Sequence, residues 1–293
     1  MTNIHKKLLT IAEKVSSRLS KIETINSVIL FGSVYQGICD DKSDVDLYVF
    51  CKPSLPSTKD RLSALGDLIS SKDKIESLAN KDCWDTSGNS YQDKYNVDGT
   101  KIDISYSTTQ WLDKIIDGVT KKGKISLPEM KFRSYTLLGL LDNCKVIFAR
   151  DSFITNSIKS IYPYPDLLQT NTIEFFYPTF KGNLEEMADC AQRDIGNIAF
   201  LFHLNWFMDA LGNILFAINK KYLPATKRCE EEYHKLQLKP HHLVRRIENI
   251  LKGPFSKNNR IKLSFELKTI FEEVDKIIAE NNPDLHRILK KNK

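Results

Sequence analysis

Two apolar runs separated by a polar loop place the strongest constraint on how this 293-residue chain can fold. The first run, Ser27–Phe31, ends at a glycine, and the second, Val45–Phe50, alternates apolar side chains with others as half-buried strands do. The loop between them closes with Asp44-x-Asp46, which places carboxylates at the start of the second run. The sequence therefore predicts a strand, a turn, a loop and a second strand that opens with acidic residues.

A hairpin is predicted further along the chain, where Asp98-Gly99 stands between two alternating segments, 94–97 and 101–106. Asp-Gly is a strong signal for a two-residue turn, because both turn positions need a positive φ. If the isoleucines of the second segment face the core, Asp103 faces the opposite side of the sheet. The hairpin thus brings a third carboxylate onto a predictable face.

The remaining pattern divides the chain into a mixed first part and a helical second part. Helices are predicted over residues 4–19, 62–69, 109–119, 131–142, 183–219, 239–252 and 261–280, and a short strand over 145–148. From residue 152 onward the patterns are almost exclusively helical. We therefore predict an α+β chain in two domains, 1–150 and 151–293, the second a helical bundle.

Composition and charge bound the possible partners. A hydrophobic content of 41% fits a globular protein with a full core, and a net charge of +6 favours an anionic partner such as a nucleoside triphosphate or RNA. The longest apolar region, 195–218, has about the length of a membrane span, but Asp209 within it would be costly in a bilayer. We therefore predict a buried helix there, a cytoplasmic protein and no membrane partner.

The carboxylates and the glycine turn have a chemical meaning together. Asp44 and Asp46 share one face of their strand, and two carboxylates so close repel each other unless a cation such as Mg²⁺ neutralises them. Asp103 would complete a cluster suited to two metal ions about 4 Å apart, which hold the attacking and leaving oxygens of a phosphoryl transfer. Gly32 lets the backbone approach a phosphate, and Ser33 can offer its N–H and hydroxyl to it.

These residues, over positions 26–106, resemble the nucleotidyltransferase superfamily related to DNA polymerase β, and in particular the bacterial aminoglycoside and lincosamide nucleotidyltransferases and their uncharacterised relatives. The resemblance implies a mixed β-sheet flanked by helices, Mg²⁺, and an NTP donor, with ATP favoured. A nucleoside monophosphate would pass to an acceptor hydroxyl while pyrophosphate leaves. By position, Gly32 and Ser33 would hold the donor phosphates, and Asp44 and Asp46 would bind metal. Asp103 would bind metal or accept the acceptor's proton, and the sequence leaves both roles open.

The chain departs from the resemblance at one place. Many relatives carry an arginine shortly after the Gly-Ser pair, where residues 34–37 read Val-Tyr-Gln-Gly. A phosphate contact made by that arginine must come from elsewhere. The segment 218–228 resembles one that follows the long helix in some bacterial relatives. From it we expect Lys227 or Arg228 to clamp the triphosphate and Tyr222 to contact the nucleotide.

The helical part is expected to bind the acceptor. Asn205, Asp209 and Asn213 recur at a spacing of four on one helix face, where they either bond to other helices or line a cleft. An acidic pocket for a cationic drug would draw on Glu185, Glu186, Asp189 and Asp209.

Three functions remain open at this point. The first is a small-molecule nucleotidyltransferase that would inactivate an aminoglycoside or lincosamide antibiotic. The second is a toxin-like member that modifies tRNA or a protein, which the positive charge favours. The third is a non-catalytic nucleotide-binding module, against which the three carboxylates argue. The sequence decides neither the acceptor, the NTP used, nor the oligomeric state.

Overall fold

The computed structural model describes residues 2–69, 76–79, 84–86, 90–224 and 229–291. Contacts between Cα atoms divide the chain into two units, Met1–Pro163 and Tyr164–Lys293. The division falls after helix α6 (Phe153–Ser160), which packs on β6 (Lys145–Ala149) and α4 (Thr109–Thr120) and so belongs with the sheet. The predicted domain boundary at residue 150 falls before this helix, because periodicity does not show which unit a helix joins.

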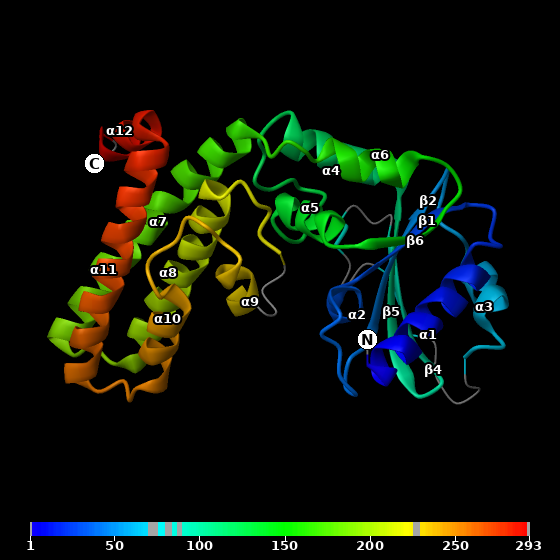
Figure 1. Cartoon of the computed structure of the whole chain (residues 1–293), viewed down its shortest axis with the longest axis horizontal. Helices are drawn as coiled ribbons and strands as arrows, with labels where there is room; N and C mark the ends of the chain where they lie inside the picture. Colours follow the sequence, from blue (N-terminus) through cyan, green and yellow to red (C-terminus); the bar gives the residue numbers. More distant parts are fainter. Residues whose placement is uncertain (1, 70–75, 80–83, 87–89, 225–228, 292–293) are drawn as a thin grey trace. The chain divides into compact units, whose positions relative to one another are not determined.

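The first unit is built on a mixed sheet, which among the described residues has six strands in the order β3-β4-β5-β2-β1-β6 (Figure 1). The strands are β1 (Ile25–Phe31), β2 (Val45–Cys51), β3 (Glu76–Ala79), β4 (Tyr91–Val97), β5 (Thr100–Thr108) and β6 (Lys145–Ala149). Strands β2 and β5 run parallel, and the other neighbouring pairs are antiparallel. The predicted α+β fold class is confirmed.

The predicted hairpin is formed by β4 and β5. Asp98 and Gly99 both have positive φ, 51° and 77°, as a two-residue turn of this kind needs. The turn fixes the register of the two strands, which places Lys94 opposite Asp103 and Asn96 opposite Lys101.

One face of the sheet is buried under helix α1 (Asn3–Leu19). Its apolar stripe of Leu8, Ile11, Val15 and Leu19 packs in one cluster with the odd-numbered residues of β2 and the isoleucines of β5. Ile4, predicted to continue this stripe, is 39% exposed because the helix begins beyond the edge of that cluster. The stripe therefore fixes which strand residues face away from α1.

Helix α3 (Thr58–Leu65) lies on the same side of the sheet as α1 (Figure 1). It begins and ends four residues earlier than the predicted segment 62–69. Ser57 and Asp60 form a capping box at its start, in which the Ser57 hydroxyl accepts from the Asp60 N–H at 3.1 Å. Gly66 follows the last helical residue, where the chain leaves the helix. The capping box, which the apolar spacing does not reveal, therefore fixes where this helix begins.

The even-numbered face of β2 is covered only beyond its first residues. Trp111 of α4 (Thr109–Thr120) stacks on Tyr48 with ring centroids 6.3 Å apart, and the Tyr48 hydroxyl is 3.0 Å from the Ser107 hydroxyl. Asp46 lies two residues before Tyr48, on the same face of β2, and is only partly buried. The start of β2 is thus the part of this face that stays open to solvent.

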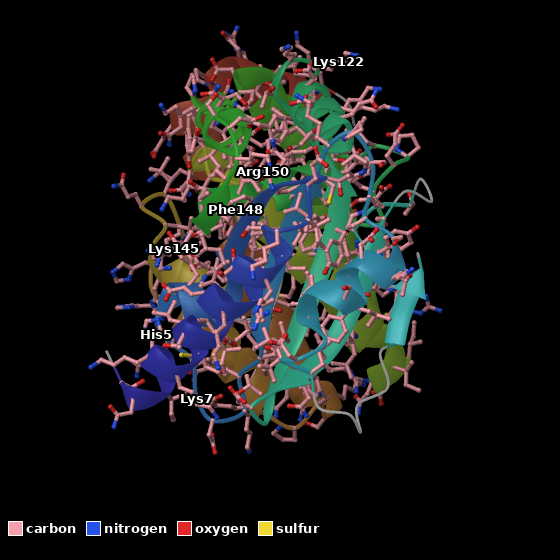
Figure 2. The ribbon with its side chains drawn as sticks, turned by 90° about the vertical axis from the view of Figure 1, so that its right-hand side faces the viewer. His5, Lys7, Lys122, Lys145, Phe148 and Arg150 are labelled. Carbon is pink, nitrogen blue, oxygen red and sulfur yellow. The ribbon has the colours of Figure 1, made fainter. Side chains whose placement is uncertain are left out.

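At the sheet edge, hydrogen bonds from Arg150 link the end of β6 to the segment that connects α1 with β1 (Figure 2). Its guanidinium donates to the carbonyl oxygens of Ser20 at 2.8 Å and Ile25 at 3.0 Å, and it lies 5.5 Å from the centre of the Phe148 ring. The contact closes the sheet on the side of β1. Helix α5 (Ser134–Asp142) precedes β6 and completes this unit.

The second unit is helical, as predicted. Its helices are α7 (Asp166–Arg193), α8 (Asn197–Ile218), α9 (Cys229–His234), α10 (Leu243–Lys252), α11 (Lys257–Asn281) and α12 (Pro283–Lys291). Phe180 of α7 lies between Phe207 of α8 and Phe271 of α11, with centroids 4.5 Å and 5.0 Å apart. This aromatic contact joins the three long helices.

The prediction of one helix over 183–219 is wrong, because the chain turns between α7 and α8. Asp194 and Gly196 have positive φ, 59° and 120°, which no α-helix allows. The buried Arg260 of α11 donates to the side chains of Asp194 and Asn197, one on each side of the turn. A partner distant in sequence therefore holds the break.

Helix α8 is long and apolar enough to cross a membrane by length and composition alone. Half of that apolar window is buried within the structure, and residues 210–218 are buried throughout. Packing inside the helical unit accounts for the apolar character of that half. The cytoplasmic location stays a prediction.

A buried ion pair lies on the α1 side of the sheet. Arg61 of α3 is 1% exposed and Asp93 of β4 is fully buried, with Nε 2.7 Å and the terminal nitrogen 3.2 Å from the carboxylate oxygens. The Tyr95 hydroxyl donates to the same carboxylate at 2.6 Å. Burial lowers the pKa of the Arg61 guanidinium, but Asp93 outweighs this effect and raises that pKa above its usual value. The Arg61 guanidinium thus keeps its positive charge inside the core.

We predict that Arg61→Met lowers the free energy of unfolding by about 3–5 kcal/mol, because it leaves the Asp93 carboxylate buried without its cation. Urea unfolding monitored by circular dichroism measures the loss. Lys59→Met, an exposed site on the same helix, is the matched control and should change little. Equal losses in the two variants would contradict this account of the pair.

Candidate active site

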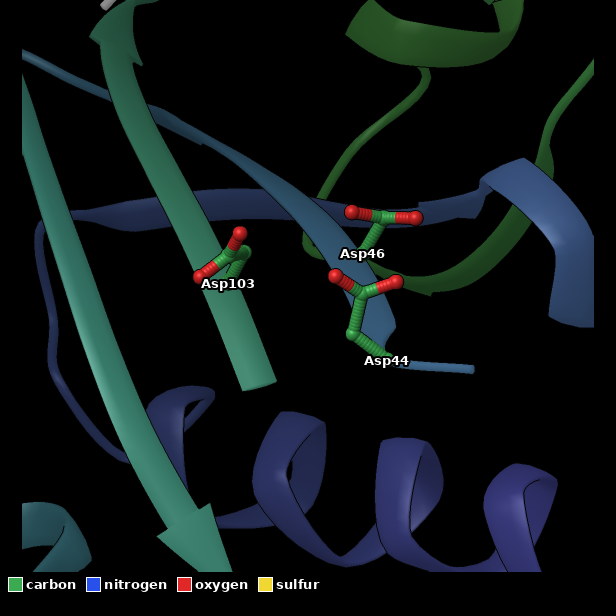
Figure 3. Close-up of side chains that lie close together, drawn as sticks. All are labelled: Asp44, Asp46 and Asp103. Atoms are coloured by element: carbon green, nitrogen blue, oxygen red, sulfur yellow. The ribbon is translucent and has the colours of Figure 1, made fainter. Parts of the chain in front are cut away.

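Three carboxylates meet at the open end of the sheet (Figure 3). Asp46 of β2 and Asp103 of β5 are register partners on adjacent parallel strands, and Asp44 immediately precedes β2. One oxygen from each lies within 4.8 Å of the others, and all three side chains are partly buried. Figure 3 shows them on the side of the strands opposite α1, as the alternation of Ile102, Asp103 and Ile104 predicts.

A local turn holds the residues before Asp44. The Asp40 carboxylate accepts from the Ser43 hydroxyl at 2.8 Å and from the Lys42 N–H at 3.0 Å, and the Ser43 hydroxyl accepts from the Asp40 N–H at 2.9 Å. Aspartate and serine commonly close turns in this way. The turn delivers the chain into β2 with Asp44 beside Asp46.

The Gly32–Ser33 turn lies directly against this cluster. Phe31 pairs with Asp46 in the sheet, and the next residue opens the short helix α2 (Gly32–Gln36). Gly32 has φ +72°, and a Cβ at this position would collide with the Asp46 carboxylate. Glycine is thus required twice, for the backbone conformation and for the close approach of Asp46. Ser33 lies in the first turn of α2 and is partly exposed.

The chemistry of these side chains fits a hard divalent cation. All three offer oxygen, which Mg²⁺ prefers, and the described cluster contains no thiolate or imidazole that would favour zinc. Carboxylates this close repel one another unless a cation lies between them. Because Gly32 has no side chain, the Asp46 carboxylate can lie against the turn. The residues present therefore fit Mg²⁺.

Two further residues predicted for the site belong to later parts of the chain. Tyr222 is in the second unit, 3% exposed, with its ring 4.8 Å from that of Tyr164. Lys227 lies outside the described residues. Their roles toward a nucleotide stay predictions. In the polar stripe of α8, Asn205 is exposed and Asn213 is buried, where its side chain donates to the Asp209 carbonyl at 2.7 Å and carboxylate at 3.2 Å.

Two lysines that the sequence motif does not include lie on the same face of the sheet as the carboxylates. Lys94 stands opposite Asp103 on β4, and Lys101 comes two residues before Asp103 on β5. Both are exposed. The signal for them was present in the sequence, since the register of the Asp98-Gly99 hairpin places both on the face assigned to Asp103.

Comparisons with known proteins found one family model that matches part of the chain. Residues 13–84 match the family model described as polymerase beta, nucleotidyltransferase, a span that holds Gly32, Ser33, Asp44 and Asp46 and ends before Asp103. A nucleotidyltransferase-like protein from Exiguobacterium sibiricum 255-15 is similar in structure, with a TM-score of 0.44 and 11% sequence identity. That match covers 95% of this chain and 78% of the other. No curated protein matches the sequence.

We predict that Gly32→Ala weakens Mn²⁺ binding, because the new methyl group displaces the Asp46 carboxylate. Calorimetric titration with Mn²⁺ measures the affinity. Gly37→Ala is the matched control, since Gly37 also has positive φ, +74°, but its nearest neighbour is the His5 ring at 3.6 Å. Both variants should lose about 1–2 kcal/mol of stability to backbone strain. Equal Mn²⁺ affinity in the two would contradict the role given to Gly32.

Proposed function

We propose that this protein is a metal-dependent nucleotidyltransferase, which moves a nucleoside monophosphate from an NTP to an acceptor hydroxyl. Residues 13–84, which match the family model described as polymerase beta, nucleotidyltransferase, support this proposal. The observation that carries the proposal is the cluster of Asp44, Asp46 and Asp103, whose oxygens lie within 4.8 Å of one another. Two parallel strands deliver these carboxylates to the open end of one sheet face. This is the arrangement that in-line phosphoryl transfer with bound metal requires.

Each residue has a role in the proposed reaction. When bound by Asp44 and Asp46, Mg²⁺ would neutralise the donor phosphates and stabilise the charge that develops during transfer. Gly32 and Ser33 would hold those phosphates through backbone N–H groups and the Ser33 hydroxyl. The acceptor oxygen forms a bond to the α-phosphorus, the bond from that phosphorus to the bridging oxygen breaks, and pyrophosphate leaves. Asp103 either binds metal or takes the proton of the acceptor hydroxyl.

For the acceptor we propose a hydroxyl of a small molecule, with ATP as the donor to test first. An aminoglycoside or lincosamide is the narrower possibility, and acidic residues of α7 were its predicted contacts. Glu185 lies 3.7 Å from Lys181, and Asp189 lies 2.9 Å from Arg193, each one turn away on the same helix. Because a basic side chain partly neutralises each of these carboxylates, helix α7 offers a cationic drug less negative charge than the sequence alone predicts.

The test is a transfer assay with NTPs labelled at the α-phosphate in the presence of Mg²⁺. The acceptors are a panel of aminoglycosides, lincosamides and phosphorylated sugars, then bulk tRNA, then the protein alone. Label entering a small molecule supports the proposal. Label entering tRNA or protein would replace the small-molecule acceptor by the toxin-like alternative. NTP binding without transfer or pyrophosphate release from any mixture would leave a non-catalytic nucleotide-binding module.

We predict that Asp44→Asn abolishes transfer. Losing a partner that merely orients a metal ligand costs 10- to 100-fold, and so losing a ligand itself should reduce the rate by about 100-fold or more. Asp41→Asn is the matched control, because Asp41 is an exposed carboxylate of the same loop and stands outside the cluster. Full activity in the Asp44 variant would overturn the assignment of the metal site.

A further inference from the structure

The hairpin of β4 and β5 carries a pair of cations beside the carboxylate cluster. Lys94 opposes Asp103, and Lys101 opposes Asn96, so the two lysines are diagonal neighbours on one face of the sheet. Diagonal positions on adjacent strands are about 7–8 Å apart at Cα, within reach of two long side chains converging on one group. The side chains of both are exposed.

Neither lysine is neutralised within the described part of the chain. The side chains of Lys94 and Lys101 have no hydrogen-bond or ion-pair partner there. Other lysines of this unit are held by carboxylates, such as Lys114 by Glu129 at 2.5 Å and Lys121 by Asp117 at 2.8 Å. The positive charge of the hairpin face is therefore available to an anion.

The place of the lysines in the sheet separates them from the donor's phosphate turn. The strand order β4-β5-β2-β1 puts the three aspartates in the middle, with Gly32–Ser33 at the end of β1 on one side and the lysines on the other. If Gly32–Ser33 holds the donor, as the proposed function has it, the acceptor approaches Asp103 from the side of β5 and β4. The lysines are then next to the acceptor.

Resting on that function, we propose that Lys94 and Lys101 bind a phosphate group of the acceptor, so that the acceptor is a phosphorylated hydroxyl compound. Lysine is a compact charge that binds phosphate well, and two of them on a small patch favour a dianion. The same pair would repel the ammonium groups of a cationic acceptor such as an aminoglycoside. The phosphate can belong to a small molecule or to a nucleic-acid backbone, and the test separates these sources.

The experiment measures binding of phosphate-bearing probes to the whole protein with its donor site occupied by Mg²⁺ and a non-hydrolysable ATP analogue. Calorimetry compares ribose 5-phosphate with ribose, and fluorescence anisotropy follows labelled bulk tRNA over a range of salt concentrations. The test variant is Lys94→Gln/Lys101→Gln. The matched control is Lys122→Gln, an exposed lysine at the far end of the unit from Lys7, which contacts the hairpin turn (Figure 2).

We expect the double variant to lose affinity for the phosphate probe by about tenfold or more, the scale of a lost charge-assisted hydrogen bond. A small-molecule source predicts this loss with ribose 5-phosphate and not with ribose. A nucleic-acid source predicts it with tRNA, together with a salt slope lower by about 2, one for each lysine. The Lys122 variant should bind as the unchanged protein does.

Two results would overturn the proposal. One is binding of the ATP analogue by the unchanged protein with no binding of either phosphate probe. The other is that the double variant binds each of the two probes with the same affinity as the unchanged protein does. Failure of the unchanged protein to bind the ATP analogue with Mg²⁺ would instead count against the proposed function itself.

Discussion

The parallel pairing of β2 with β5 is the contact on which the rest of the first unit depends. It sets Asp46 beside Asp103, and in the same register it sets Val45 beside Ile102 and Leu47 beside Ile104. Because neighbouring residues of a strand face opposite sides, one register both assembles the carboxylates and buries the apolar residues under α1. The hydrophobic core and the candidate metal site are thus products of the same strand alignment.

The parts of this arrangement that local chemistry encodes could be predicted from the sequence. Asp98-Gly99 specifies its own turn, and the isoleucines around Asp103 specify its face. The direct pairing of β5 with β2 has no short-range signal, because two further strands separate them in the chain; only the chemistry of the three carboxylates suggested that they lie close together. The contact of Gly32 with Asp46 was equally hidden, because it depends on how β1 and β2 align.

In the helical unit the same limit appears in another form. Apolar periodicity predicted a continuous helix through residues 194–196, where a single glycine is a weak reason to stop. The side chain that holds the turn, Arg260, belongs to a helix much later in the chain. Tyr222 likewise has a buried ring contact that its neighbours in sequence do not reveal. Contacts with residues distant in sequence determine the structure at these positions, and local sequence patterns do not reveal such contacts.

The buried pair of Arg61 and Asp93 has a consequence for how reliably the chain reaches its final alignment. Asp93 and Lys94 are adjacent, so shifting β4 by one residue would carry Lys94 into the core and take Asp93 away from its arginine. Misaligned hairpins would therefore be penalised while the protein folds, and few would persist. The Arg61–Asp93 pair, although it lies on the other face of the sheet from the reacting groups, thus favours the strand alignment in which Lys94 is exposed beside Asp103.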